Sequence, residues 1–219
     1  MVARPSLVVP LSAAAGFLLL LALTVAGWAP LDRVDLAVSD VFREYGERRP
    51  DLVAVFRVAT DVAATVPFVA AGLVTGLALA VRGDRRPAAF CVAVTVLVPV
   101  LWALMHWLVY HPRPVDGFVV VTSNGFPSGH TSNAAAAALV VVLLLWSGLG
   151  PAGRALTVGL AVVFGVLVGL TRVALVVHWP TDVLGGWLLA LAVVPLVARL
   201  VAARPAADAD RRVAARPAA

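Results

Sequence analysis

Long runs of hydrophobic residues, separated by polar segments, make up most of the chain. The runs cover residues 6–28, 58–81, 88–109, 130–149, 155–177 and 182–203. A helix needs about 20 apolar residues to cross a hydrocarbon core about 30 Å thick. Each run reaches that length, so the pattern predicts an all-α fold, a six-transmembrane-helix bundle that forms a single membrane domain over residues 1–203.

The polar segment after the first run has a helical pattern of its own. Between residues 31 and 52, charged side chains of both signs surround apolar positions at helical spacing, namely Leu31, Val34, Val38, Val41 and Phe42. One apolar stripe on a polar helix is typical of a helix that lies in the membrane interface. We therefore expect an amphipathic helix between the first two spans.

The two ends of the chain need separate interpretation. Residues 6–28 stand where a signal peptide would, but the apolar stretch is too long and no small-x-small cleavage site follows it, which favours a membrane helix. From Arg204 onward the sequence is rich in Ala, Arg and Asp. We expect residues 204–219 to form a disordered cytoplasmic tail.

Composition supports the membrane interpretation. Hydrophobic residues make up 62% of the chain, charged residues make up 13%, and the mean hydropathy is +0.98. A soluble domain is about 45–50% apolar and about 25% charged, so an ordinary soluble domain is excluded. The formal net charge is +5, but the 17 basic residues, all Arg, are scattered over loops and tail without a nucleic-acid motif. We expect the bilayer, and no nucleic acid, as a partner.

The arginines also predict the orientation. An even number of crossings puts both termini on one side, and that side carries ten arginines against seven on the other. The positive-inside rule makes the termini cytoplasmic and the amphipathic helix extracytoplasmic. Trp28, Trp107 and Trp179 then lie near the outer interface, as an aromatic belt would. The sequence predicts a multi-pass protein of the cell (plasma) membrane.

Ionisable residues gather on the same outer side. All four histidines and two arginines fall at or near the outer ends of the predicted spans: His106, His111, His130, His178, Arg113 and Arg172. Such groups are costly in or near lipid and usually mark function. Three separate segments therefore bring chemistry to one membrane face.

The three segments contain short motifs in a fixed order. They read His106-Trp-Leu-Val-Tyr-His111-Pro-Arg113-Pro114, then Pro127-Ser128-Gly129-His130, then Arg172-Val-Ala-Leu-Val-Val-His178-Trp-Pro-Thr-Asp182. Together they resemble the signature of the type 2 phosphatidic acid phosphatase superfamily, which is Lys-x6-Arg-Pro, Pro-Ser-Gly-His and Arg-x5-His-x3-Asp. One position departs from it, because His106 stands where the family has Lys. A neutral imidazole would bring no full positive charge to a phosphate.

The resemblance implies a metal-independent membrane lipid phosphatase that uses no cofactor. It implies that His178 is the nucleophile and forms a phosphohistidine, that Asp182 orients its ring, and that His130 is the general acid and base. It also implies a phosphate-binding set, which comprises Arg113, Arg172, Ser128, Gly129 and His106. These residue types suit the tasks, because guanidinium forks match phosphate oxygens and the N–H groups of a helix N-terminus attract anions. Pro180 should begin the last helix and place Asp182 in its first turn.

Several functional alternatives stay open at the level of sequence. Undecaprenyl diphosphate is the favoured substrate, and phosphatidic acid or phosphatidylglycerol phosphate is next. A lipid phosphotransferase and a non-catalytic lipid-phosphate-binding paralogue are alternatives to a hydrolase. Four histidines could supply zinc ligands, but two nearby arginines would repel a cation, so we expect no metal. The sequence sets no oligomeric state.

Three further interpretations concern residues beside the motifs. We expect His111 to be an interfacial or capping residue, because no motif position matches it. We expect Arg57 and Asp61 to form an i,i+4 ion pair without a catalytic role. We expect Gly185 and Gly186 to allow close helix packing.

Overall fold

The computed structural model describes residues 2–202, and within them all regular secondary structure is helical. The predicted tail, residues 204–219, lies outside the described residues. The α-helices are α1 (Val8–Val25), α2 (Ala29–Arg48), α3 (Pro50–Thr60), α4 (Thr65–Val81), α5 (Arg85–Leu108), α6 (Gly129–Leu145), α7 (Pro151–Ala174) and α8 (Pro180–Ala202). Short 3-10 turns follow α3 at Asp61–Ala63 and α6 at Trp146–Gly148.

The described residues contain 6 helical segments that are long and apolar enough to cross a membrane. The predicted all-α fold with six spans is therefore confirmed. The second segment differs most from its prediction, because it begins at Pro50 rather than near residue 58 and is interrupted by the turn Asp61–Ala63. Asp51 and Arg57 lie in the first turns of this segment, and their charges lower the hydropathy there. The hydropathy pattern therefore predicted a start that is too late.

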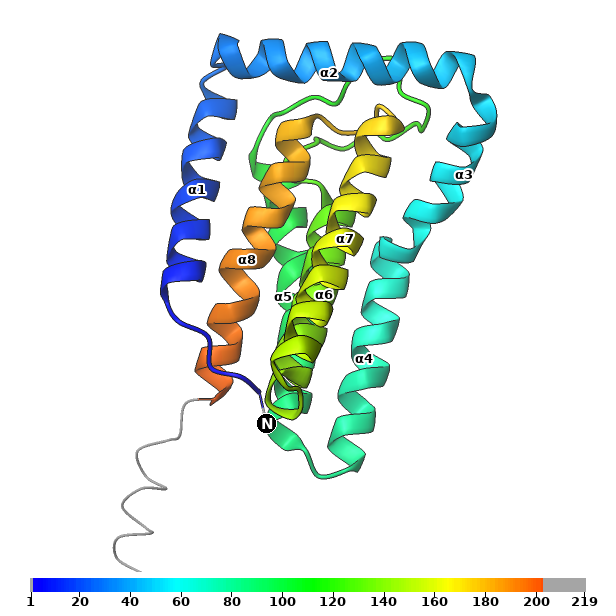
Figure 1. Cartoon of the computed structure of the whole chain (residues 1–219). Helices are drawn as coiled ribbons and strands as arrows, with labels where there is room; N and C mark the ends of the chain where they lie inside the picture. Colours follow the sequence, from blue (N-terminus) through cyan, green and yellow to red (C-terminus); the bar gives the residue numbers. More distant parts are fainter. Residues whose placement is uncertain (1, 203–219) are drawn as a thin grey trace, which may run out of the picture.

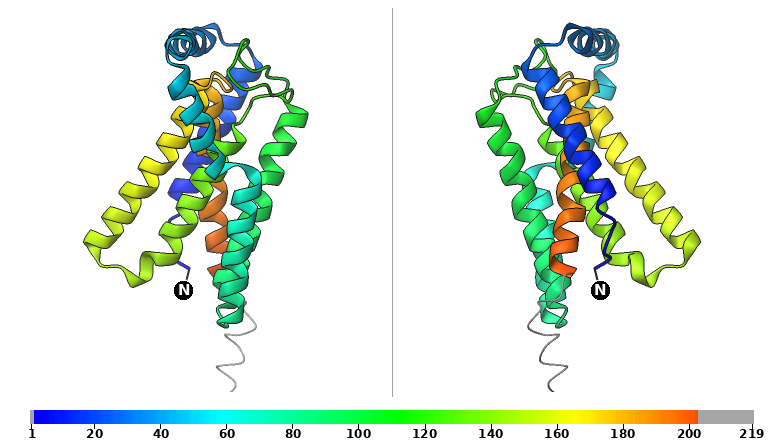
Figure 2. Two further views of the ribbon diagram at one scale, coloured as in Figure 1. Left: turned by 90° about the vertical axis from the view of Figure 1, so that its right-hand side faces the viewer. Right: turned by 90° about the vertical axis from the view of Figure 1, so that its left-hand side faces the viewer.

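The long helices form a bundle that α2 crosses at one end (Figure 1). Helix α1 packs on α8, α4 packs on α5, and α6 lies between α7 and α8. Figure 2 shows α2 end-on over the same end of the bundle from both sides. The long loop between α5 and α6 passes beneath α2 (Figure 1), so three distant parts of the sequence meet at this end.

The predicted apolar stripe of α2 faces the bundle only in part: Leu31 packs on a buried cluster, and Val38 and Phe42 are half-buried. Asp35, Ser39 and Gly46 are its buried residues, whereas Val34 and Val41 are exposed. Asp35 accepts hydrogen bonds from the backbone N–H of Thr181 at 3.1 Å and from its hydroxyl at 2.5 Å. A buried carboxylate therefore joins α2 to the first turn of α8.

Glycines in α8 let this helix approach the loop before α6. A Cβ on Gly185 would come within 2.6 Å of the Phe126 ring, and a Cβ on Gly186 within 2.9 Å of the Ser128 carbonyl oxygen. Real Cβ atoms do not approach so closely, so only glycine fits at both positions. The predicted role of these glycines in close packing is confirmed, and it holds residues 126–128 against the start of α8.

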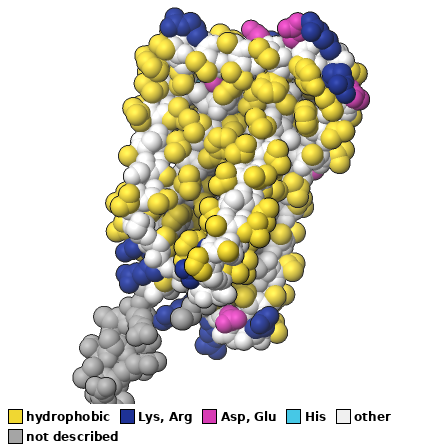
Figure 3. Space-filling model, in the orientation of Figure 1, with side chains coloured by type: hydrophobic (Ala, Val, Ile, Leu, Met, Phe, Trp, Pro, Cys, Tyr) yellow, Lys and Arg dark blue, Asp and Glu magenta, His cyan; other side chains and the backbone are white. Residues whose placement is uncertain are grey.

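The surface between the two ends of the bundle is hydrophobic. On the face seen in Figure 3, arginines and acidic residues gather at the ends, and apolar side chains cover the helices between them. Val66, Leu77 and Val81 of α4 are 79%, 66% and 80% exposed. Lipid is the solvent that tolerates such a surface. With six candidate spans, the chain is a multi-pass membrane protein.

Candidate active site

His178 and Asp182 form a buried pair at the start of α8. His178 Nδ1 lies 3.1 Å from Asp182 Oδ2, and the two side chains are 2% and 0% exposed. The same carboxylate oxygen accepts a hydrogen bond from the backbone N–H of Trp179 at 3.0 Å. Helix α8 begins at Pro180, so His178 precedes the helix and Asp182 lies in its first turn, as the sequence predicted.

Arg113 also contacts the His178 ring, and its Nη1 lies 3.3 Å from Nδ1. Its Nη1 lies 2.8 Å from His178 Nε2 and donates to the Val177 carbonyl oxygen at 2.8 Å. Its Nε and Nη2 donate to the carbonyl oxygens of Ser123 and Asn124 at 2.8 and 3.1 Å. These bonds fix the guanidinium group between the loop and the histidine.

The charge state of His178 follows from its surroundings. Burial lowers the pKa of His178 well below its ordinary value, and the positive charges of Arg113 and Arg172 lower it further. The folded protein therefore holds this imidazole in the neutral form, which is the form that has a lone pair to offer. His130 and His106 are close enough to add to the same effect.

Ser128 and Gly129 shape the N-terminus of α6. Ser128 is the N-cap, and its side-chain oxygen faces the backbone N–H of Thr131 at 3.5 Å. The Ser128 N–H donates to the Asp182 carbonyl oxygen at 2.9 Å, which ties the start of α6 to the start of α8. A Cβ on Gly129 would approach the Trp102 ring within 3.0 Å. The Ser128 cap and the close packing of Gly129 on the Trp102 ring thus position His130 in the first turn of α6.

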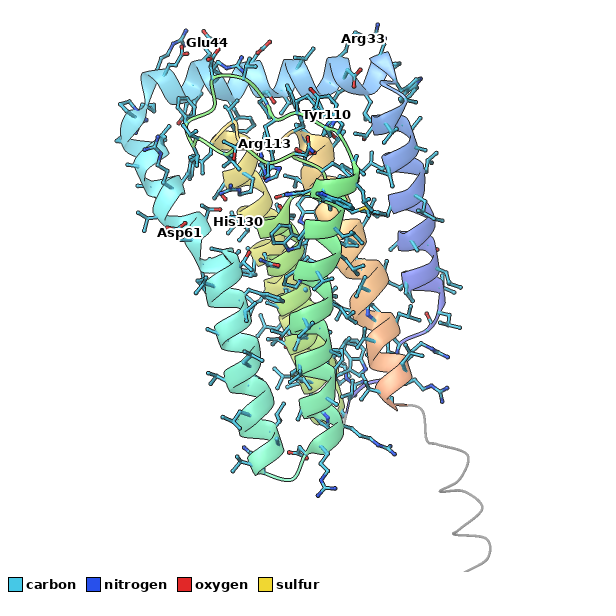
Figure 4. The ribbon with its side chains drawn as sticks, turned by 180° about the vertical axis from the view of Figure 1, so that it is seen from behind. Arg33, Glu44, Asp61, Tyr110, Arg113 and His130 are labelled. Atoms are coloured by element: carbon cyan, nitrogen blue, oxygen red, sulfur yellow. The ribbon has the colours of Figure 1, made fainter. Side chains whose placement is uncertain are left out.

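A pocket of about 500 Å³ opens beside His130 and Arg172. Its lining also includes Arg57, Thr60, Asp61 and the loop residues Phe118, Val119, Val120 and Val121. Arg172 is 4% exposed, and its Nη1 donates to Thr60 Oγ1 at 3.1 Å. Figure 4 shows Arg113 and His130 beneath α2, inside the end of the bundle. The pocket gives an anion room next to a histidine and a buried guanidinium group.

His106 lies in the same region but makes a different contact from the one the sequence predicted. Its Nε2 is 2.8 Å from the Pro127 carbonyl oxygen, and its ring is 5.2 Å from the Trp102 ring, centroid to centroid. The Asn124 amide donates to the His106 carbonyl oxygen at 2.9 Å. His106 therefore braces the segment that carries Ser128 and Gly129.

Two residues that match no motif position make contacts other than those that the sequence suggested. His111 is largely buried, because its side chain is 15% exposed, and its Nε2 lies 3.4 Å from Asp182 Oδ1. Within residues 2–202, no ion pair joins Arg57 to Asp61, and Arg57 Nη2 instead donates to the Phe118 carbonyl oxygen. Both corrections depend on the path of the loop between α5 and α6, which spacing along one helix does not reveal. The clustering of four histidines was the one sequence signal for His111.

The described part of the chain contains no group of three His, Cys, Asp or Glu side chains placed to hold a metal ion. The positive groups next to His178 are guanidinium groups, which bind phosphate directly. The chemistry that this region offers is therefore the buried set of His178, Asp182 and Arg113, together with a pocket whose lining includes His130 and Arg172.

Comparisons with known proteins place the chain in a family. The model of the PAP2 superfamily matches residues 45–206. Phosphatidylglycerophosphatase B of Escherichia coli (strain K12) is 39% identical over 101 residues, a match that covers 43% of this chain and 38% of that protein. The protein of the same name from Shigella flexneri gives the same values. The match thus spans less than half the length of these relatives.

A solved structure extends the similarity to nearly the whole chain. The crystal structure of a transmembrane PAP2 type phosphatidylglycerolphosphate phosphatase from Bacillus subtilis aligns with a TM-score of 0.75 and 27% sequence identity. The alignment covers 93% of this chain and 96% of the other. The family model, the sequence matches and this shared fold agree, and the chain belongs to the PAP2 superfamily.

Proposed function

We propose that this chain hydrolyses a phosphomonoester or diphosphate on a membrane lipid through a phosphohistidine on His178. The observation that carries the proposal is the chain of contacts from Asp182 to His178 to Arg113, next to a pocket lined by His130 and Arg172. Phosphoryl transfer needs mainly positioning and charge stabilisation, and these residues offer both.

The proposed reaction has two steps. The lone pair on His178 Nε2 attacks phosphorus, the bond to the leaving oxygen breaks, and His130 gives that oxygen a proton. His130 then takes a proton from water, the water oxygen attacks phosphorus, and the bond to Nε2 breaks to release phosphate. Asp182 stabilises the positive charge that the His178 ring gains. Arg113 and Arg172 neutralise the phosphate oxygens, so the scheme needs no metal and no cofactor.

The relatives suggest which lipid to test first. Both the curated relatives and the similar solved structure are named for phosphatidylglycerol phosphate, so we place this lipid ahead of undecaprenyl diphosphate, which the sequence alone favoured. Phosphatidic acid remains the third candidate. A lipid phosphotransferase and a non-catalytic paralogue that binds lipid phosphates are the alternatives.

We also propose an orientation for the site. The arginine distribution favours cytoplasmic termini, which puts α2, the pocket and both catalytic histidines at the extracytoplasmic face. Exposed Val34 and Val41 suit α2 lying in the interface, with its charged side chains in water. A lipid could then keep its tails in the bilayer while its headgroup enters the pocket.

The test is phosphate release from a panel of lipid phosphates by purified protein in detergent. We expect turnover to continue in EDTA and His178→Ala to lower kcat at least about 10³-fold. Activity that survives His178→Ala would refute the nucleophile, and activity lost in EDTA and restored by a divalent ion would refute the metal-free scheme. Products formed only with an added acceptor lipid would identify a phosphotransferase. Tight binding without phosphate release would identify a binding protein.

A further inference from the structure

The pocket beside His130 has a wall that none of the three motifs provides. Arg57 and Thr60 from the last turns of α3 and Asp61 from the turn that follows line the same space as Arg172. Figure 4 shows Asp61 at the junction of α3 and α4, on the side of the bundle toward which His130 lies. A headgroup bound at His130 and Arg172 would therefore meet this wall.

Arg57 is held in place on the wall by one end of its side chain. Its Nη2 donates to the Phe118 carbonyl oxygen. The backbone N–H of Phe118 donates to the Leu175 carbonyl oxygen at 3.0 Å, and the Phe118 ring packs on a buried cluster that includes Val53 and Leu175. A guanidinium group has five N–H donors, so an anchored Arg57 still has donors for a ligand.

Thr60 connects this arginine to the phosphate site. Arg57 and Thr60 are three residues apart on α3, and residues at that spacing are neighbours on one helix face. Thr60 accepts the hydrogen bond from Arg172 Nη1 at 3.1 Å. Arg57 and Arg172 thus offer two positive charges along one wall, with the single negative charge of Asp61 beside them.

This inference rests on the phosphatase activity proposed above. We propose that Arg57 is a specificity-determining residue that binds a second anionic group of the lipid, the phosphate that stays on the product. Phosphatidylglycerol phosphate and undecaprenyl diphosphate carry a second phosphate beside the one that is removed, and phosphatidic acid does not. The wall therefore favours lipids with two phosphate groups.

The test compares kcat/KM for phosphatidylglycerol phosphate and phosphatidic acid in the same detergent. Arg57→Gln lowers kcat/KM for the two-phosphate lipid about tenfold, mainly through KM, and changes the value for phosphatidic acid less than about twofold. Arg57→Lys keeps the positive charge but loses the planar guanidinium fork. The ratio of kcat/KM for phosphatidylglycerol phosphate to kcat/KM for phosphatidic acid therefore falls about threefold. Arg33→Gln is the matched control, because Arg33 is exposed on α2 and is not part of the pocket lining; its selectivity stays that of the wild type.

Failure of this inference can be separated from failure of the proposed function. A wild-type protein that releases no phosphate from either lipid refutes both. An active wild type whose Arg57→Gln variant loses both substrates equally, or neither, overturns the role of Arg57 alone. If Arg57→Gln folds poorly, the Arg57→Lys variant decides, and an unchanged ratio between the two lipids overturns the assignment.

Discussion

Arg113 Nη1 lies 2.8 Å from His178 Nε2, and Asp182 Oδ2 lies 3.1 Å from the Nδ1 of the same ring. Arg113 Nη1 also lies 3.3 Å from Nδ1, so the arginine faces both ring nitrogens, whereas Asp182 contacts Nδ1 alone. An ionised Asp182 accepts a hydrogen bond from Nδ1 and so favours the neutral tautomer whose Nε2 has the lone pair. The Asp182 contact is therefore the one that would make Nε2 the nucleophilic atom.

We expect Arg113→Gln to lower kcat/KM about 10²-fold or more, because the variant loses both the phosphate-binding charge and the donor that faces Nε2. Arg113→Lys should recover part of the charge but not the forked contacts. The measurement is steady-state phosphate release, with thermal unfolding as the control, since Arg113 also bonds the carbonyl oxygens of Ser123 and Asn124. Wild-type kinetics in Arg113→Gln would contradict a role for this arginine.

The pH dependence of His178 gives a second prediction. Burial and the charges of Arg113 and Arg172 lower the pKa of His178 below the ordinary value of 6.5, so its ring stays neutral as the pH falls through that value. In the profile of kcat/KM against pH, we expect the fall in activity that protonation of His178 causes to lie well below pH 6.5. Folding stability should fall in the same range, because the unfolded chain binds a proton there and the folded chain does not.

Histidine ¹⁵N chemical shifts in detergent measure this titration directly. In Arg113→Gln one repelling charge is gone, so the titration of His178 should move upward toward its ordinary value. A wild-type His178 that titrates at or above pH 6.5 would show that the ring is not held neutral.

The sequence predicted the parts of the site that lie within the motifs. Pro180 begins α8, so the sequence placed His178 just before this helix and Asp182 in its first turn, and the family resemblance implied their contact. Ser128 in Pro-Ser-Gly is a helix cap by its local chemistry. The positions of these residues at the helix starts depend on neighbours in the chain, so spacing and residue type were enough to predict them.

The rest of the site depends on contacts between distant segments. His111 meets Asp182, and Asp35 meets Thr181, across a large part of the chain. Val176 adopts a positive φ of 50° between α7 and α8, a conformation that a β-branched residue rarely takes. No local sequence pattern predicts such a turn. The conformation exists because packing on both sides of Val176 fixes the backbone.

The position of His111 gives a third prediction. Its Nε2 is 3.4 Å from Asp182 Oδ1, the carboxylate oxygen that does not bond His178. We expect His111→Ala to lower kcat about tenfold with little change in KM, because Asp182 loses its neighbour and orients His178 less firmly. His111→Gln keeps a side-chain N–H and should recover part of kcat. Equal losses in both variants, or a change confined to KM, would argue against a positioning role.

Asp35 gives a fourth prediction, which concerns stability. Its carboxylate is 4% exposed and accepts both donors of Thr181. Asp35→Ala leaves those donors unpaired in a buried place, so we expect the free energy of unfolding to fall by about 1–3 kcal/mol. Asp40→Asn on the same helix is the control, because Asp40 is 64% exposed and pairs with Arg43 on the surface; its effect should stay within about 0.5 kcal/mol. Equal thermal stability of the two variants would contradict the role of Asp35.

His106 gives the last prediction, because its contact limits what it can do for a phosphate. A carbonyl oxygen only accepts, so the bond to Pro127 puts the proton of a neutral His106 ring on Nε2. The remaining nitrogen then has a lone pair and cannot donate to a phosphate oxygen. We expect His106→Gln, which keeps an N–H donor, to stay within about threefold of wild-type kcat/KM, and His106→Ala to lose about tenfold. If His106→Gln is as poor as His106→Ala while His106→Lys lowers KM for lipid phosphates, the side chain at this position contacts the substrate instead of bracing the loop.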